Sequence, residues 1–264
     1  MKTHNLAIDS KTFLNSGITG KIKKLPVITK FWGLDSEELF NKNLETLPED
    51  WRYRTQSVEY NINSLGYRAP EFDQVDWKNS VVMFGCSTTF GDGVNEDDTI
   101  PAQLSKIIGR PVINMGAGGT SQMWSLHNAI ILKEYYPTPV AVVNFWTSIY
   151  RATTYNMGGP EKQGPWNENS VYQNWIQHGN AEAQAYFTHL LSKNLWHNQA
   201  IYYDFTWCDM MRYITGCDMV PEESVTLNGN YKNLARDLCH QGPESLRCIA
   251  ENIAVKLCER GLSY

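Results

Sequence analysis

Three residues whose side chains can together perform nucleophilic catalysis lie close to predicted element boundaries. Ser87 directly follows a short apolar run, and Asp237 and His240 form an Asp-x-x-His pair before the last predicted helix. A serine hydroxyl needs a base to accept its proton, and an imidazole base needs a partner that orients it. Taken singly, Ser87 is more typical of a helix cap, and Asp-x-x-His pairs often occur by chance. Taken together, the three residues predict a catalytic triad.

A glycine turn supplies a second candidate feature. Gly116-Ala117-Gly118-Gly119 follows another apolar run. Glycines leave the backbone N–H groups unobstructed by side chains, and such groups can stabilise the oxyanion of a tetrahedral intermediate. Alone, the sequence is more typical of an ordinary tight turn. Its place at a strand end, like that of Ser87, favours the interpretation as an oxyanion-binding loop.

Apolar runs that alternate with helical patterns indicate the elements that position these residues. The runs at 80–84, 111–115 and 139–146 predict buried strands. Helical spacing over 99–108 and 121–135 separates them. This alternation predicts a parallel sheet with helices on its faces, and the carboxyl ends of such strands gather functional groups.

The remainder of the chain has weaker patterns. Helical spacing predicts further helices at 37–44, 181–196 and 243–257. Between 200 and 235 no segment is a convincing Val/Ile run, so no fourth strand is predicted there. The stretch 60–68 carries turn residues and is expected to be irregular.

Other functional motifs fail in their details. The α/β-hydrolase motif needs glycine two residues after the serine, where Thr89 stands. Neither glycine turn leads into the Gly-Lys-Ser/Thr of a phosphate-binding loop, and Ser121 occupies the third glycine position of a dinucleotide fingerprint. Four residues that could ligate a metal lack two close-spaced pairs, and we predict neither a metal nor a cofactor. These four are Cys208, Asp209, Cys217 and Asp218.

Composition excludes several functional classes. Of the 264 residues, 42% are hydrophobic and 12% aromatic, which excludes a disordered chain. The net charge of -5 provides no basic footprint, so we expect neither nucleic acid nor an anionic membrane as partner. No apolar run approaches the roughly 20 residues of a membrane span. With no visible signal peptide and six cysteines without a C-x-x-C pair, we expect a cytoplasmic or otherwise soluble protein with reduced thiols.

The blocks around these candidates resemble the SGNH hydrolases, also called the GDSL esterase/lipase family, over roughly residues 60–258. The segment 85–94 (GCSTTFGDGV) is similar to the first family block, with Ser87 at the nucleophile position and its N–H as an oxyanion donor. The segment 114–120 (NMGAGGT) is similar to the second block and places Gly119 at the oxyanion glycine. The segment 237–243 (DLCHQGP) resembles the last block, with Asp237 and His240 in the triad.

Two departures from the family pattern stand out. Cys86 replaces the aspartate of Gly-Asp-Ser, which is not the triad acid. The third block, Gly-x-Asn-Asp, is not recognisable. Alignment by strand places Ser148 where the oxyanion asparagine belongs, with Asn144 as a compensating candidate. Losing one oxyanion donor typically costs about 3 kcal/mol of transition-state stabilisation.

The resemblance implies a three-layer α/β/α sandwich with a mainly parallel, flavodoxin-like sheet. We expect residues 1–75 to form an irregular lead-in packed on a main domain, 76–264, with an aromatic-rich insertion at about 150–235. The implied activity is hydrolysis of a carboxylic ester through an acyl-enzyme, and the aromatic, polar insertion favours an O-acetylated carbohydrate or another small-molecule ester as substrate. The missing third block leaves open a catalytically weak or inactive binding module on the same scaffold.

Overall fold

A five-stranded sheet forms the centre of the protein. The computed structural model describes residues 27–156, 159–168, 170–177, 179–226 and 230–263. The sheet order is β4-β3-β5-β8-β9, and every neighbouring pair runs parallel. Counted along the chain, this order is 2-1-3-4-5, the flavodoxin-like arrangement. The strands are β3 (Val81–Gly85), β4 (Val112–Gly116), β5 (Ala141–Trp146), β8 (Ile201–Thr206) and β9 (Asp218–Met219).

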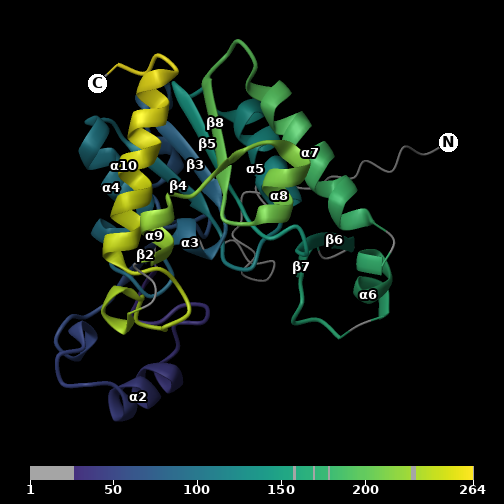
Figure 1. Cartoon of the computed structure of the whole chain (residues 1–264). Helices are drawn as coiled ribbons and strands as arrows, with labels where there is room; N and C mark the ends of the chain where they lie inside the picture. The colour runs from purple at the N-terminus through teal and green to yellow at the C-terminus, as the bar shows by residue number, and fades with distance from the viewer. Residues whose placement is uncertain (1–26, 157–158, 169, 178, 227–229, 264) are drawn as a thin grey trace.

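Helices cover both faces of this sheet (Figure 1). Helices α4 (Ile100–Ile108) and α10 (Pro243–Glu259) pack on one face. Helices α5 (Gln122–Tyr135) and α7 (Asn180–Trp196) pack on the other. The predicted three-layer α/β/α fold with a parallel sheet is therefore confirmed.

Burial on both faces explains the continuous apolar strands. In β3, Val81 and Met83 belong to the core shared with α4 and α10, whereas Val82 and Phe84 belong to the core under α5. All four side chains are fully buried. Because successive strand residues point to opposite faces, each position must be apolar when both faces are covered.

The strand β8 corrects the prediction that no strand lies between residues 200 and 235. It pairs in parallel with β5 along its whole length. Tyr203 and Phe205 fill the core positions, and Phe205 stacks on Phe145 with ring centroids 4.4 Å apart. Tyr202 and Tyr203 lie opposite Val142 and Val143 of β5, and aromatic side chains are as well suited to strands as valine.

The predicted helices agree with the structure to within two residues at each boundary. Thr99 caps α4 by accepting a hydrogen bond from the N–H of Ala102 (3.3 Å), and Gly109 ends the helix at a φ of 64°. Proline begins α10, where its missing N–H is not needed. Among the described helices, none is long and apolar enough to cross a membrane.

The N-terminal segment contains helix α2 (Glu37–Thr46) and an antiparallel pair of strands, β1 (Val27–Thr29) and β2 (Tyr60–Ile62). Its aromatic core includes Phe90, which follows β3 in the sequence. The predicted division at residues 75 and 76 stays a prediction, and residues 1–26 of the lead-in lie outside the described residues.

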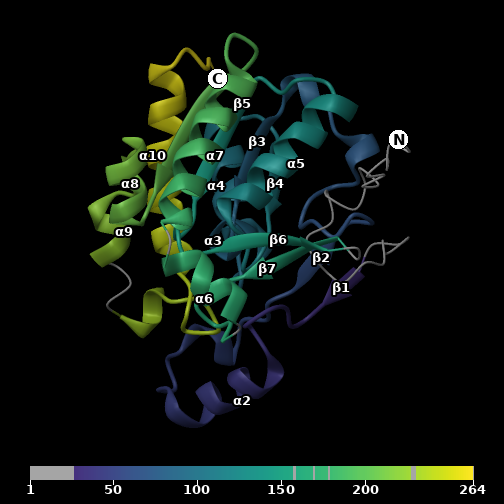
Figure 2. The same ribbon diagram turned by 90° about the vertical axis from the view of Figure 1, so that its right-hand side faces the viewer.

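The aromatic-rich region after β5 forms an antiparallel hairpin of β6 (Ala152–Asn156) and β7 (Gly159–Gln163). In both views this hairpin and α2 lie beyond the end of the sheet at which the short helix α3 (Ser87–Phe90) lies (Figure 2).

The structure describes further short helices. The α-helices among them are α6 (Ser170–Gln177), α8 (Asp209–Thr215) and α9 (Glu222–Thr226). The 3-10 helices are η1 (Arg52–Arg54), η2 (Phe72–Gln74), η3 (Trp77–Asn79), η4 (Glu96–Asp98) and η6 (Tyr231–Asn233).

Candidate active site

The carboxyl end of β3 holds Ser87, which is the first residue of helix α3. Strand β3 lies between β4 and β5 in the sheet, so the strand order reverses at β3. Ligands of open α/β sheets bind at such a point of reversal. The turn packs closely on the end of β4, because a Cβ atom at Gly116 would collide with the backbone nitrogen of Phe90. Glycine at this position lets the two loops approach each other.

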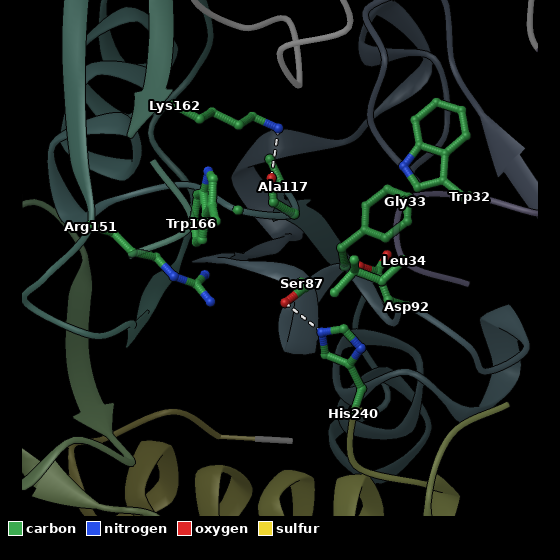
Figure 3. A pocket seen from close by; sticks show the side chains of 13 residues that line it. Trp32, Gly33, Leu34, Ser87, Asp92, Ala117, Arg151, Lys162, Trp166 and His240 are labelled. Carbon is green, nitrogen blue, oxygen red and sulfur yellow. Dashed lines mark hydrogen bonds between the residues drawn. The ribbon is translucent and has the colours of Figure 1, made fainter. Parts of the chain in front are cut away.

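The structure brings Ser87, His240 and Asp237 into one hydrogen-bonded chain, of which Figure 3 shows the contact between Ser87 and His240. The Nε2 atom of His240 lies 2.8 Å from Ser87 Oγ, and its Nδ1 atom lies 2.5 Å from Asp237 Oδ2. Asp237 is buried, whereas the His240 side chain retains 11% exposure. With the ring proton on Nδ1, Nε2 is free to accept the proton of the serine hydroxyl.

The loop that carries Asp237 and His240 is fixed by its own hydrogen bonds. The other carboxylate oxygen, Asp237 Oδ1, accepts from the backbone N–H groups of Cys239 (2.9 Å) and His240 (3.1 Å). Leu238, between Asp237 and Cys239, has a φ of 57°, a left-handed conformation that costs a non-glycine residue of order 1 kcal/mol. Surrounding contacts hold this conformation: Asn43 of α2 donates to the carbonyl of Arg236 at 3.0 Å.

The electrostatic environment of His240 strengthens its imidazole as a base. Burial alone would lower the pKa of the imidazole, but the hydrogen bond and the negative charge of Asp237 outweigh burial and raise it above its ordinary value. A raised pKa makes the imidazole a stronger base towards the serine proton, and the same ring can return that proton later in the reaction.

The candidate oxyanion donors differ in their position relative to the pocket that contains Ser87. Gly119 lines the pocket next to Ser87, and its N–H has no hydrogen-bond acceptor among the described residues. Neither Ser148 nor Asn144 is among the residues that line this pocket. The Ser148 hydroxyl accepts from the N–H of Tyr150 (3.3 Å), and the Asn144 amide donates to the hydroxyl of Tyr202 (3.1 Å). The role of Ser148 as an oxyanion donor stays a prediction.

Cys86, which stands at the family's aspartate position, is buried directly before the candidate nucleophile. Burial would raise the pKa of its thiol, but the surrounding groups, chiefly the positive charge of Arg151, lower it overall. Arg151 therefore acts electrostatically on the turn that holds Ser87.

A pocket of about 490 Å³ opens over Ser87 and His240. Sequence reasoning gave no role to six of the side chains that line it, and five of these six come from segments that are remote in sequence from Ser87. The N-terminal segment, the turn after β3 and the region after β5 contribute them: Trp32, Leu34, Asp92, Arg151, Lys162 and Trp166. The sequence signals that covered some of them were the block 85–94, which contains Asp92, and the aromatic-rich insertion, which contains Arg151, Lys162 and Trp166.

Asp92 is the one carboxylic acid that lines this pocket among the described residues. Burial raises its pKa to about 7, and the nearby His240 opposes part of that increase. One of its oxygens, Oδ1, is buried without a hydrogen-bond partner. At neutral pH this carboxyl is therefore only partly ionised.

No cluster of three or more potential metal ligands occurs among the described residues. A scan against models of protein families gives no match, and a search of curated proteins gives none either.

Solved structures similar to this chain include two G-D-S-L proteins and one esterase. A putative lipolytic protein of the G-D-S-L family from Desulfitobacterium hafniense is 14% identical, with a TM-score of 0.41, over 67% of this chain and 99% of that one. A member of the lipolytic protein G-D-S-L family from Veillonella parvula is 13% identical, with a TM-score of 0.44, over 69% of this chain and 98% of that one. An acetyl xylan esterase from the rumen bacterium Butyrivibrio proteoclasticus is 10% identical, with a TM-score of 0.40, over 78% of this chain and 66% of that one. At these values the similarities establish neither a family nor an activity for the chain.

Proposed function

We propose that this protein is a serine hydrolase that cleaves carboxylic esters. The observation that carries the proposal is the hydrogen-bonded chain from Ser87 through His240 to buried Asp237 at a pocket that a small ester can enter. A nucleophile, a base and an orienting carboxylate in that geometry are the parts that acyl transfer requires.

In the acylation step, Ser87 Oγ attacks the ester carbonyl carbon and its proton passes to His240 Nε2. The carbonyl electron pair moves onto oxygen and forms a tetrahedral oxyanion. When that intermediate collapses, the bond to the alkoxy group breaks, and His240 gives its proton to the departing alcohol. Water repeats the sequence on the acyl-enzyme, releasing the carboxylic acid and restoring Ser87. The charge of Asp237 stabilises the imidazolium that forms in both steps.

The oxyanion is assigned to backbone N–H groups at two strand ends. Ser87 begins α3, so its N–H lacks an acceptor within that helix. Gly119 supplies the second donor from the loop after β4. Ser148 is the proposed third donor, and if its hydroxyl does not reach the oxyanion, the rate is lower by roughly two orders of magnitude.

The substrate proposed is an O-acylated carbohydrate or a similarly polar small ester. Two tryptophans, Trp32 and Trp166, line the pocket, and Trp166 keeps 53% of its surface exposed. Flat aromatic faces beside charged side chains such as Arg151 and Lys162 suit a sugar ring better than an alkyl chain. Comparison of acetylated sugars with long-chain esters tests this choice, and a preference for chains beyond about eight carbons would refute it.

Turnover of p-nitrophenyl acetate tests the hydrolase proposal. We expect Ser87→Ala to lower kcat by about 10⁴-fold or more, because the nucleophile is lost. Ser57→Ala is the matched control, since Ser57 is an exposed serine of the N-terminal segment outside the pocket. Equal rates for wild type and Ser87→Ala would refute the proposal.

A fluorophosphonate probe separates the hydrolase from a non-catalytic binding module. Ser87 Oγ would form a bond to phosphorus as the bond to fluorine breaks, and fluoride leaves while the serine proton passes to His240. Labelling that depends on Ser87 supports the hydrolase, and complete resistance of the native protein supports the binding module.

A further inference from the structure

Two cationic side chains enter the pocket from the region after β5. Arg151 lies in the connection between β5 and β6, and Lys162 lies on β7. In Figure 3 the two side chains approach from the same side of the pocket, with Trp166 between them, and the guanidinium of Arg151 points towards Ser87. The pocket therefore has a cationic wall beside the candidate nucleophile.

Neither cation is neutralised by a carboxylate. Among the described residues, no acidic oxygen lies within 4.0 Å of the charged groups of Arg151 or Lys162. Lys162 Nζ donates one hydrogen bond to the carbonyl of Gly118 (2.6 Å), which leaves it two further protons. The Nη1 atom of Arg151 is buried and has no hydrogen-bond partner. An unpaired buried guanidinium nitrogen is costly unless a ligand satisfies it.

The charges in the pocket sum to a positive region at neutral pH. Burial, joined by the positive charge of Arg151, lowers the pKa of Lys162 to about 8, although Asp92 opposes the shift. Lys162 is thus mostly protonated at pH 7, whereas Asp92 is only partly ionised and His240 already has Asp237 as its partner. A positive pocket in a chain with a net charge of -5 is a local feature, not a consequence of composition.

We infer that the pocket selects an ester whose molecule also carries a carboxylate, which binds between Arg151 and Lys162 while the ester carbonyl lies at Ser87. This inference rests on the proposed hydrolase function and names its substrate class. A carboxylate would satisfy the unpaired Nη1 of Arg151 through a charge-assisted hydrogen bond and relieve the repulsion between the two cations. The aromatic face of Trp166 lies beside both, so an acylated acidic sugar fits this arrangement.

The competing role for Arg151 is that of an oxyanion donor in place of the family's missing asparagine. That role concerns the ester carbonyl, which all substrates share, so it would affect charged and neutral esters equally. If Arg151 instead selects the substrate, its loss should lower kcat/KM for the charged ester more than for the neutral ester. The ratio of the two specificity constants therefore distinguishes the roles.

The test compares acetylated methyl glucuronoside with acetylated methyl glucoside, esterified at the same hydroxyl and differing only in the carboxylate. At pH 7 and low salt we expect wild-type kcat/KM to be at least about tenfold higher for the glucuronoside. In Arg151→Gln the ratio should fall to near one. Arg247→Gln should retain the wild-type ratio, because Arg247 is an exposed arginine of α10 outside the pocket.

Two results would overturn the inference while leaving the hydrolase proposal intact: equal hydrolysis of both esters by wild type, or an unchanged ratio in Arg151→Gln. A direct binding measurement covers the case in which neither ester is hydrolysed. Calorimetry on Ser87→Ala should show glucuronate binding at least about tenfold more tightly than glucose, with the preference lost on adding Arg151→Gln. Equal binding of the two sugars would overturn the inference by itself.

Discussion

Arg236 and Asp35 form a buried, two-pronged ion pair between segments that are far apart in the sequence. Arg236 Nε donates to Asp35 Oδ1 at 2.9 Å, and Nη2 donates to Oδ2 at 2.7 Å. Both side chains are at most 4% exposed, and the rings of Phe31 and Phe40 lie against the guanidinium. Because Arg236 directly precedes Asp237, this pair fastens the proposed catalytic loop to the N-terminal segment.

Removing the negative partner should therefore destabilise the fold and disturb the site together. We expect Asp35→Asn to lower the free energy of unfolding by about 3–5 kcal/mol, because Arg236 would remain buried without its counter-charge. Asp50→Asn is the matched control, since it removes an ion pair with Lys232 on the surface. Urea unfolding of both variants measures the difference, and losses of equal size would contradict the role given to the Arg236–Asp35 pair.

The sequence alone was sufficient to predict three strands of the central sheet, β3, β4 and β5. The strands β3, β4 and β5 are mostly apolar, with Asn114 and Asn144 as buried polar exceptions, because both faces of the sheet are covered. Strand β8 escaped prediction because Tyr202 and Asp204 interrupt the apolar pattern, although its aromatic residues occupy core positions. A criterion that counted aromatic residues as strand formers would have found it.

The candidate site could be predicted where its residues follow strand ends or form a recognisable pair. Ser87 and Gly119 were identified from strand ends and His240 from its Asp-x-x-His pair before the last predicted helix, and the three residues line one pocket. Arg151 and Lys162 lie in a region without a recognisable pattern, and their proximity results from the β6–β7 hairpin. No spacing rule connects such residues, because loop conformation decides which of them meet.

The proposed triad predicts a definite pH dependence. Since His240 must be neutral to accept the serine proton, kcat/KM for a neutral ester should rise as pH increases through its raised pKa, then level off. Asp237→Asn removes the interactions that raise this pKa, so the rising limb should move to lower pH while kcat falls about 10⁴-fold. Exposed Asp209 provides the control variant Asp209→Asn. A profile in Asp237→Asn identical to wild type would exclude Asp237 from the mechanism.

Buried Asp92 should make stability depend on pH in the opposite direction from an ion-paired acid. Its pKa is raised from 3.8 to about 7, so between these values the folded chain keeps a proton that the unfolded chain releases. Stability contributed by this group is therefore lost as pH rises from about 4 to 7.

Asp92→Asn removes this ionisation, so relative to wild type the variant should gain stability between pH 4 and pH 8, by up to roughly 4 kcal/mol. Urea unfolding at the two pH values measures the gain, with exposed Asp73→Asn as the control. A difference from wild type that does not change with pH would show that Asp92 ionises normally.

Alanine substitution at Gly119, compared with the same substitution at Gly109, separates an effect on stability from an effect on catalysis. Gly119 and Gly109 both have left-handed φ angles, 72° and 64°, and a Cβ atom would fit at either place, with its nearest neighbour 3.6 Å away at Gly119 and none within 4 Å at Gly109. Substitution by alanine should therefore cost both positions a similar strain of about 1–2 kcal/mol.

Only Gly119→Ala should also lower kcat, by about 10²-fold, because relaxation of the strained backbone turns the proposed oxyanion N–H away from the carbonyl oxygen. Thermal unfolding with steady-state kinetics on both variants measures the two effects separately. If Gly119→Ala loses stability like Gly109→Ala and retains full kcat, the oxyanion donor must lie elsewhere, and Ser148 or Arg151 would be the next position to substitute.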